Sequence, residues 1–490
     1  MNSLPRWAVR HARGLSTVYR RLTLAARQAA PFVRWLGASR SERLVAPLEH
    51  AAKGALFDCR RCGDCTLSVT GLACVMTCAK RMRNGPCGGV RADGGCEVRP
   101  DRRCTWLFAA EGDARIGAGH SATWRQRVRP LDHRRVGRSN WIPAILDQKR
   151  DAVPDVDAKQ AAAVPHHGAP SRFEQACAAR RAAGEPIVTV EIAPPDSADP
   201  APLLARAGRF AGLVDAINIT DGAGANCHMS SVAAASVLAA AGFEPVCQVG
   251  CRDRNRIALQ GDVLGAAALG VRNVLCLTGD DVSQGDHPGA KPVFDLDAVN
   301  LLRLLRGMRD EGRFASGRLL ERAPQLFLGA TANPFVPPYV ERVDNLERKV
   351  DAGARFIQTQ FCFDLARLED FMAAVRARGL HERAHILVGV GMLSSARALR
   401  WMAEHVPGVH VPEVVTRRIG AAADPVAEGV RWCVETITAL RSIEGVAGVH
   451  LMGHRNEATL ARVIVQAGLR QATCDSSPGA PLRPALETPS

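Results

Sequence analysis

Short apolar runs alternate with longer helical stretches between Ser171 and Leu469. Each run is rich in β-branched or other apolar residues and has the length of a buried parallel strand. The segments between them have helical spacing and often end at glycine. The eight runs are PIVTVEIA (186–193), LVDAINIT (213–220), EPVCQV (244–249), NVLCLTG (273–279), QLFLGATA (325–332), FIQTQF (356–361), HILVGVG (385–391) and GVHLMG (448–453). Eight strands alternating with eight helices predict an α/β fold, a (β/α)8 TIM barrel over residues 173–469.

An open, doubly wound parallel sheet is the alternative architecture for the same alternation. In such sheets a GxGxxG turn after the first strand typically holds a dinucleotide. No such turn follows residues 186–193, and the closed barrel is therefore favoured.

The rest of the 490-residue chain differs in texture from the barrel region. Residues 1–50 form a basic leader, predicted to be helical or partly disordered, and residues 51–110 are dense in Cys, Gly and Arg. Residues 111–172 have the mixed polar composition of a linker with some helix. Residues 470–490 are rich in Pro and Ser and are predicted to form a disordered tail. The sequence therefore predicts a small N-terminal Cys-rich domain joined to the barrel.

Polar residues gather where the predicted strands end. Because the chemistry of a (β/α)8 barrel takes place at the carboxyl ends of its strands, these residues would share one rim. Glu191 lies among apolar residues, a setting that suits a carboxyl group to donate a proton near neutrality. A salt-bridged structural glutamate is the alternative. Gln360 carries an amide that can donate and accept at once, which suits a heterocycle such as a pterin or a flavin.

Five motifs in this region carry a family resemblance. In order they are VEIAPP (190–195), NITDGA (218–223), LTGD (277–280), RKVDAGA (348–354) and TQFCFD (359–364). Together they resemble the methylenetetrahydrofolate reductases. The resemblance implies a flavin-dependent (β/α)8 barrel, an oxidoreductase that acts on CH–NH groups. It would reduce 5,10-methylenetetrahydrofolate to 5-methyltetrahydrofolate in one-carbon metabolism.

The same resemblance implies roles for individual residues. Glu191 would be the general acid that assists opening of the folate ring, and Asp280 would favour the resulting cation through its negative charge. Gln360 would hydrogen-bond the folate substrate. The residues implied to hold the flavin are Thr220, Gln248, Thr278, Gly279, Asp280 and Lys349.

Three positions depart from the family pattern. Gln248 stands where many members have His, Thr278 stands where Arg often precedes Gly-Asp, and Arg342 falls on an acidic contact to the adenosine half of the flavin. These changes affect contacts to the flavin, whereas the residues that handle the folate are retained. The resemblance implies FAD in preference to FMN, but because these departures fall on flavin contacts, FMN and hydride taken directly from NAD(P)H stay open.

Sixteen cysteines are present, and eight of them fall within one short segment. Their spacing is typical of metal binding, because thiolates two or three residues apart can chelate one ion or cluster from a single turn. An iron–sulfur cluster, zinc or both would fit, and disulfides are the alternative. The predicted ligands are Cys59, Cys62, Cys65, Cys74, Cys78, Cys87, Cys96 and Cys104. The other cysteines are scattered singly through apolar segments, as in a reducing, cytoplasmic compartment.

The cysteine segment also resembles a known domain. Residues 40–106, with GPCGG at 85–89, are similar to the Cys-rich domain that accompanies methylenetetrahydrofolate reductases of acetogens. In such systems this domain is thought to carry metal and to connect the reductase to an electron donor. The resemblance therefore implies a redox protein as a second source of electrons besides NAD(P)H.

The net charge of +14 is concentrated at the N-terminus, where residues 1–50 carry nine arginines and two glutamates. We interpret this basic segment as a solvated leader, and binding to nucleic acid or to a membrane surface is the alternative. No apolar run is long enough to span a membrane. A non-catalytic folate or methyl-group binding partner and a metal-stabilised nucleic-acid binder are the competing function classes. Retention of Glu191 favours the enzyme; a homo-oligomer stays open.

Overall fold

The computed structural model describes residues 3–117, 128–147 and 169–471, and its centre is a closed barrel of eight parallel strands. Each strand pairs with its neighbours in the sequence, and β8 pairs with β1 to close the ring. The strands are β1 (Ile187–Ile192), β2 (Ala216–Ile219), β3 (Pro245–Gly250), β4 (Asn273–Leu277), β5 (Phe327–Ala332), β6 (Phe356–Phe361), β7 (His385–Gly391) and β8 (Val446–Met452). The predicted (β/α)8 barrel is confirmed, and the open doubly wound sheet is excluded.

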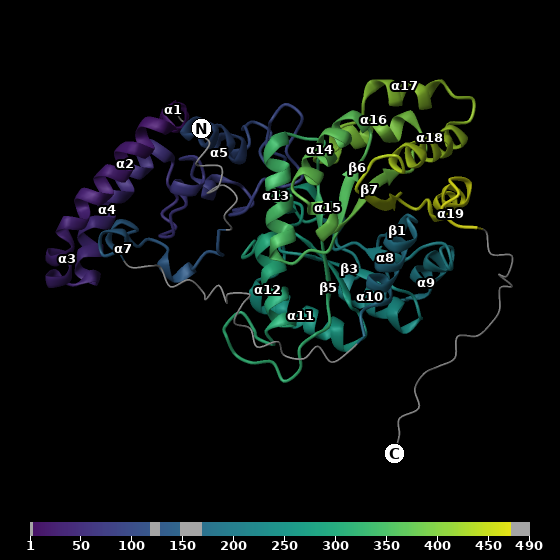
Figure 1. Ribbon diagram of the computed structural model, residues 1–490, viewed down its shortest axis with the longest axis horizontal. Helices are drawn as coiled ribbons and strands as arrows, with labels where there is room; N and C mark the ends of the chain where they lie inside the picture. Colours follow the sequence, from purple (N-terminus) through teal and green to yellow (C-terminus); the bar gives the residue numbers. More distant parts are fainter. Residues whose placement is uncertain (1–2, 118–127, 148–168, 472–490) are drawn as a thin grey trace, which may run out of the picture.

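Helices surround the barrel and cover the outward-facing apolar side chains of the strands (Figure 1). They are α8 (Arg172–Ala183), α9 (Ala201–Gly208), α10 (Ser231–Ala240), α11 (Arg256–Ala268), α12 (Ala298–Asp310), α13 (Tyr339–Ala352), α14 (Leu365–Ala377), α15 (Leu380–Arg383), α16 (Ala396–His405), α17 (Glu413–Ala421), α18 (Pro425–Leu440) and α19 (Glu457–Gln466). Side-chain oxygens at several helix starts accept backbone N–H groups, as Asp364 does from Arg367. The chain departs from strict alternation after β7, where three helices precede β8.

One end of the barrel is plugged by aromatic rings. Phe173 of α8 lies under the strands, with its ring centroid 5.6 Å from that of Phe327 and 5.2 Å from that of Phe356. Gly329 makes room for this packing, because a Cβ atom there would lie 2.3 Å from the ring of Phe356. The interior of the barrel is therefore closed by apolar side chains at its amino-terminal end, and it opens toward the carboxyl end.

The N-terminal part of the chain is helical before and after an irregular cysteine segment. Helix α4 crosses residue 50, the boundary expected from composition, and runs to Phe57. The cysteine segment is then held between α4 and α5, with buried Trp106 of α5 in its apolar core. The helices are α1 (Ser3–Arg10), α2 (Ala12–Ala26), α3 (Ala30–Leu36), α4 (Ala38–Phe57), α5 (Thr105–Ile116) and α7 (Trp141–Ile145).

The cysteine segment packs against the carboxyl end of the barrel. Lys80 Nζ donates to the carbonyl of Gly279, just after β4, at 2.7 Å. Asp297, which caps α12, accepts the backbone N–H groups of Arg83 and Asn84 at 3.1 and 2.8 Å. These contacts place the N-terminal domain beside the rim where the sequence predicts the active site.

The loop 85–89 makes the second part of this contact and lies along α13. Arg348 donates to the carbonyl of Gly85 at 2.6 Å, and Arg342 donates to that of Cys87 at 2.6 Å. Asn333, after β5, donates to the carbonyl of Gly88 at 2.7 Å. Among the described residues, no helix is long and apolar enough to cross a membrane.

Candidate active site at the barrel mouth

Glu191 lies near the end of β1 and points into the barrel. Its Oε2 atom accepts a hydrogen bond of 2.9 Å from Nε2 of Gln248 on β3. Because β1 and β3 are not neighbours, this bond must cross the barrel interior. The side chain of Glu191 is 28% exposed, so that the carboxyl group is held in place yet can be reached from the mouth.

A buried histidine lies behind Glu191. Nε2 of His450, on β8, is 3.7 Å from Oε2 of Glu191, and its Nδ1 is 2.9 Å from the hydroxyl of Thr189. Gln358 donates to that hydroxyl at 3.2 Å and exchanges two hydrogen bonds with Asn218 on the opposite strand β2. If the hydroxyl accepts from Gln358 and donates to Nδ1, the histidine carries its proton on Nε2, facing Glu191.

This inner polar layer is absent from the sequence prediction. His450, Gln358 and Asn218 each sit inside a run that reads as a buried strand. The sequence could have indicated them, because alternate residues of a strand face the same side. Each of these three residues is two positions from a residue of the apolar plug or of the rim on its own strand, and therefore also faces the barrel interior. Polar residues at such positions are expensive to bury without partners, and this indicates a network.

Thr220 and Gln248 are the predicted flavin contacts on β2 and β3. The hydroxyl of Thr220 is buried and has no hydrogen-bond partner in the described structure. Such a group commonly indicates a ligand that completes it, and this fits the predicted cofactor. Gln248 is instead bonded to Glu191, which makes it a residue that orients the acid.

The loop after β4 brings together three predicted residues. Thr278 accepts the backbone N–H of Ala298 at 3.2 Å and so holds the start of α12. Gly279 has φ +94°, and a Cβ atom there would lie 3.0 Å from Cβ of Arg252, so that glycine is required for the turn. Asp280 accepts the N–H of Gly224, from the β2 loop, at 3.0 Å. The carboxylate is thereby fixed at the rim between two loops.

Gln360 and Lys349 lie on the β5–β6 side of the rim. Oε1 of Gln360 accepts the N–H of Phe361 at 3.0 Å, which leaves its NH2 group to donate. Nζ of Lys349 donates to the carbonyl of Thr331 at 2.6 Å. Burial, with the nearby charges of Arg342 and Arg348, lowers the pKa of Lys349 to about 8. A bound anion would stabilise its charged form.

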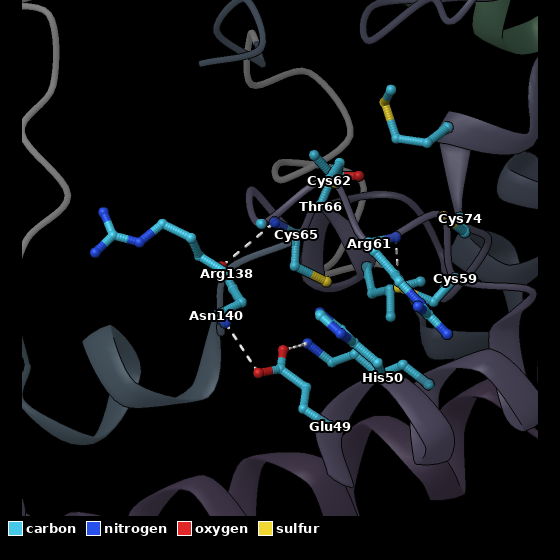
Figure 2. A pocket seen from close by; sticks show the side chains of 14 residues that line it. Glu49, His50, Cys59, Arg61, Cys62, Cys65, Thr66, Cys74, Arg138 and Asn140 are labelled. Atoms are coloured by element: carbon cyan, nitrogen blue, oxygen red, sulfur yellow. Dashed lines mark hydrogen bonds and ion pairs between the residues drawn. The ribbon is translucent and has the colours of Figure 1, made fainter. Parts of the chain in front are cut away.

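The eight predicted cysteine ligands fall into two groups. Four of them line a cavity next to α4, together with Glu49 and Lys53 (Figure 2). The other four line a second cavity, together with Lys80 and Glu97. The first group is Cys59, Cys62, Cys65 and Cys74, and the second is Cys78, Cys87, Cys96 and Cys104.

Burial dominates the acid–base behaviour of these thiols. It raises the pKa of Cys74 and of Cys78 to about 12 and raises that of Cys87 well above its ordinary value. All the described cysteines are free thiols. Within the described ranges, no three or more His, Cys, Asp or Glu side chains are gathered closely enough to hold one metal ion. The metal ligation of these cysteines therefore stays a prediction.

A closed (β/α)8 barrel with a carboxylic acid, amides and an unpartnered hydroxyl at its mouth defines a class of barrel proteins that bind ligands at this rim. The family description "Methylenetetrahydrofolate reductase" matches residues 174–468, and the chain belongs to this family. A second description, "Methylene-tetrahydrofolate reductase C terminal", matches residues 38–133, which include all eight clustered cysteines.

A curated relative is a probable methylenetetrahydrofolate reductase (NADPH) from Caenorhabditis elegans. It is 24% identical over 249 residues, which are 49% of this chain and 34% of the relative. The chain thus spans about a third of that protein's length. Similar solved structures include an uncharacterized Clostridium thermocellum protein that binds two copies of 5-methyl-5,6,7,8-tetrahydrofolic acid (14% identity, TM-score 0.41, 61% of this chain and 98% of that chain). A 2,3-dimethylmalate lyase is also similar (13% identity, TM-score 0.34, 61% and 84%).

Proposed function

We propose that the barrel reduces 5,10-methylenetetrahydrofolate to 5-methyltetrahydrofolate, with Glu191 as the general acid. The observation that carries this proposal is the position of the carboxyl group, which opens to the barrel mouth while Gln248 holds one of its oxygens at 2.9 Å. Mere binding of a folate does not need an oriented acid at this place. Membership of the methylenetetrahydrofolate reductase family supports the same reaction.

Glu191 would protonate the leaving nitrogen as the five-membered ring of the folate opens. A Gln248 hydrogen bond to Oε2 fixes which carboxyl oxygen faces the substrate. Nε2 of His450, 3.7 Å from the same oxygen, faces the carboxylate that remains once the acid has given its proton away. The buried partners Thr189 and Gln358 keep the imidazole oriented.

The other rim residues would bind and orient the reactants. Thr220 offers an unpartnered hydroxyl, and Lys349 offers a cation that an anionic ligand would stabilise. Asp280 would favour the cationic ring-opened folate through its charge, and the NH2 group of Gln360 would donate to the pterin. A reduced flavin, when bound there, supplies the hydride.

The position of Arg342 bears on the kind of flavin. The family resemblance assigns this position to the adenosine half of FAD, but here its guanidinium is buried and donates to the carbonyl of Cys87. The loop 85–89 therefore lies where that half of the cofactor would be contacted. In place of the FAD expected from the sequence, we propose that the flavin is the shorter FMN.

We further propose that the two cysteine groups hold iron–sulfur clusters or zinc, and that they carry electrons from a redox protein or from NAD(P)H. The spacing of the eight cysteines along the chain, and the lining of each of two cavities by four of them, support this. The second cavity shares Lys80 with the contact to Gly279, so this group lies on the side of the domain that meets the barrel.

Replacement of Glu191 by Gln tests the reaction. The variant keeps the shape and the Gln248 contact but loses the proton, and general acid catalysis contributes about 10² to 10⁴ in rate. We expect the turnover of methylenetetrahydrofolate to fall by that factor while folate binding, measured by calorimetry, changes little. The matched control is Glu369→Gln, an exposed glutamate of α14. Full activity of Glu191→Gln would refute the mechanism.

A further inference from the structure

Large apolar side chains are exposed on the N-terminal arm, which we define as helices α1–α4 (residues 3–57). Such residues normally stand singly on a protein surface, and their accumulation in one short region indicates an interaction site. Trp35 is the most exposed, at 79%. The others with more than half of their surface exposed are Val18, Leu22, Leu24, Phe32, Leu44 and Leu48.

These side chains point away from the interior of the arm because their neighbours already fill it. On α3, Val33 is buried and packs with Ile142 of α7, so Phe32 and Trp35 on either side of it face outward. Their rings form a pair with centroids 5.7 Å apart. In Figure 1, α3 lies at the end of the arm farthest from the barrel.

The same arm carries positive charge without free acids to balance it. All nine arginines of residues 1–50 are exposed. Only Arg27 pairs with an acidic side chain in the described part of the chain, with Asp147. The two glutamates are used internally, since Glu42 pairs with Arg138 and Glu49 is buried against Lys53.

We propose that the N-terminal arm lies on an anionic membrane surface, with Phe32, Trp35 and the exposed leucines inserted at the level of the headgroups. The unbalanced arginines favour a negatively charged partner. The apolar side chains protrude from three different helices, and a fluid bilayer interface accepts such side chains without matching pockets, whereas a folded acidic protein would need one for each. Because no described helix can span a bilayer, the arm lies on the surface rather than across it.

This placement leaves the barrel accessible. The arm meets the cysteine segment and α5, and the cysteine segment meets the barrel. A membrane under α3 would therefore hold the enzyme by the end of the arm that lies farthest from the barrel. The inference does not depend on the reaction proposed above.

The test is co-sedimentation of the full chain with vesicles of phosphatidylglycerol and phosphatidylcholine, compared with phosphatidylcholine alone. We expect binding to the anionic vesicles that weakens steeply with salt. The triple variant Arg34→Gln/Arg40→Gln/Arg43→Gln should lower the partition coefficient by about a hundredfold, at about fivefold for each arginine. Phe32→Ser/Trp35→Ser should lower it about tenfold or more.

The barrel provides a matched control on α16, where Trp401, Arg397 and Arg400 are also exposed. The variants Trp401→Ser and Arg397→Gln/Arg400→Gln should bind vesicles like the unaltered chain. Circular dichroism checks that each variant is folded. No sedimentation with anionic vesicles, or equal loss with the α16 variants, would overturn the proposal. So would light scattering that shows a dimer dissolved by Trp35→Ser, or salt-sensitive retention on polyglutamate or DNA without vesicle binding.

Discussion

The ion pair between Lys80 and Glu97 offers a sharp test of how the two domains are joined. Both side chains are almost fully buried, with 4% and 3% of their surface exposed. Lys80 also donates to the carbonyl of Gly279 at 2.7 Å, and Glu97 accepts from the thiol of Cys87 at 3.3 Å. The pair thus lies between the second cysteine group and the barrel rim.

Lys80→Met would leave the carboxylate of Glu97 buried without a cation. The backbone of Gly89 packs closely against this carboxylate, because a Cβ atom at Gly89 would lie 1.5 Å from Oε2 of Glu97. Removal of one partner of a buried pair costs about 3–5 kcal/mol, and the carbonyl of Gly279 also loses its donor. Glu97→Gln should cost less, because Asp280 lies close enough to act on the charge of Lys80.

The double variant Lys80→Met/Glu97→Gln should be more stable than Lys80→Met alone, because no unpaired charge remains. Urea unfolding followed by tryptophan fluorescence measures these free energies, and metal content is checked on each variant. Arg172→Gln is the control, since it breaks a surface pair with Glu244 in which the arginine is 64% exposed, and it should cost less than about 1 kcal/mol. A cost below about 1 kcal/mol for Lys80→Met, or strictly additive costs, would refute the reasoning.

Three further predictions concern the barrel. Gly329→Ala should lower the free energy of unfolding by about 1–3 kcal/mol, because the new methyl group meets the ring of Phe356; an unchanged urea midpoint would contradict this. Lys349 has a folded-state pKa of about 8, below its unfolded value of about 10.4, so its contribution to stability is unfavourable below pH 8 and improves as the pH rises from 8 to 10. Lys349→Met should flatten that part of the stability–pH curve relative to the unaltered chain. Finally, flavin released by heat and identified by mass spectrometry should be FMN, and recovery of FAD would refute the argument from Arg342.

The barrel could be predicted from the sequence because its strands are fully buried. Runs such as EPVCQV (244–249) and QLFLGATA (325–332) correspond to β3 at Pro245–Gly250 and β5 at Phe327–Ala332. A continuous apolar run is what a parallel strand covered on both faces requires. The rim residues followed from the strand ends, and the structure places Glu191 and Asp280 at that rim.

The inner partners could not be predicted in the same way. His450 and Gln358 lie inside apolar runs, and only the closed barrel brings their side chains toward Glu191. The contact between Gln248 and Glu191 joins non-adjacent strands and depends on the barrel diameter. Arg342 binds loop 85–89 through a backbone carbonyl. Because every residue has such a carbonyl, the sequence does not indicate this contact.

The aromatic plug formed by Phe173, Phe327 and Phe356 closes one end of the barrel, so the polar groups inside it can be reached only from the carboxyl end. The cysteine segment covers one side of that end, along the loops after β4 and β5. Any ligand that reaches Glu191 must then enter from the carboxyl end, along the part of the rim that the cysteine segment leaves uncovered.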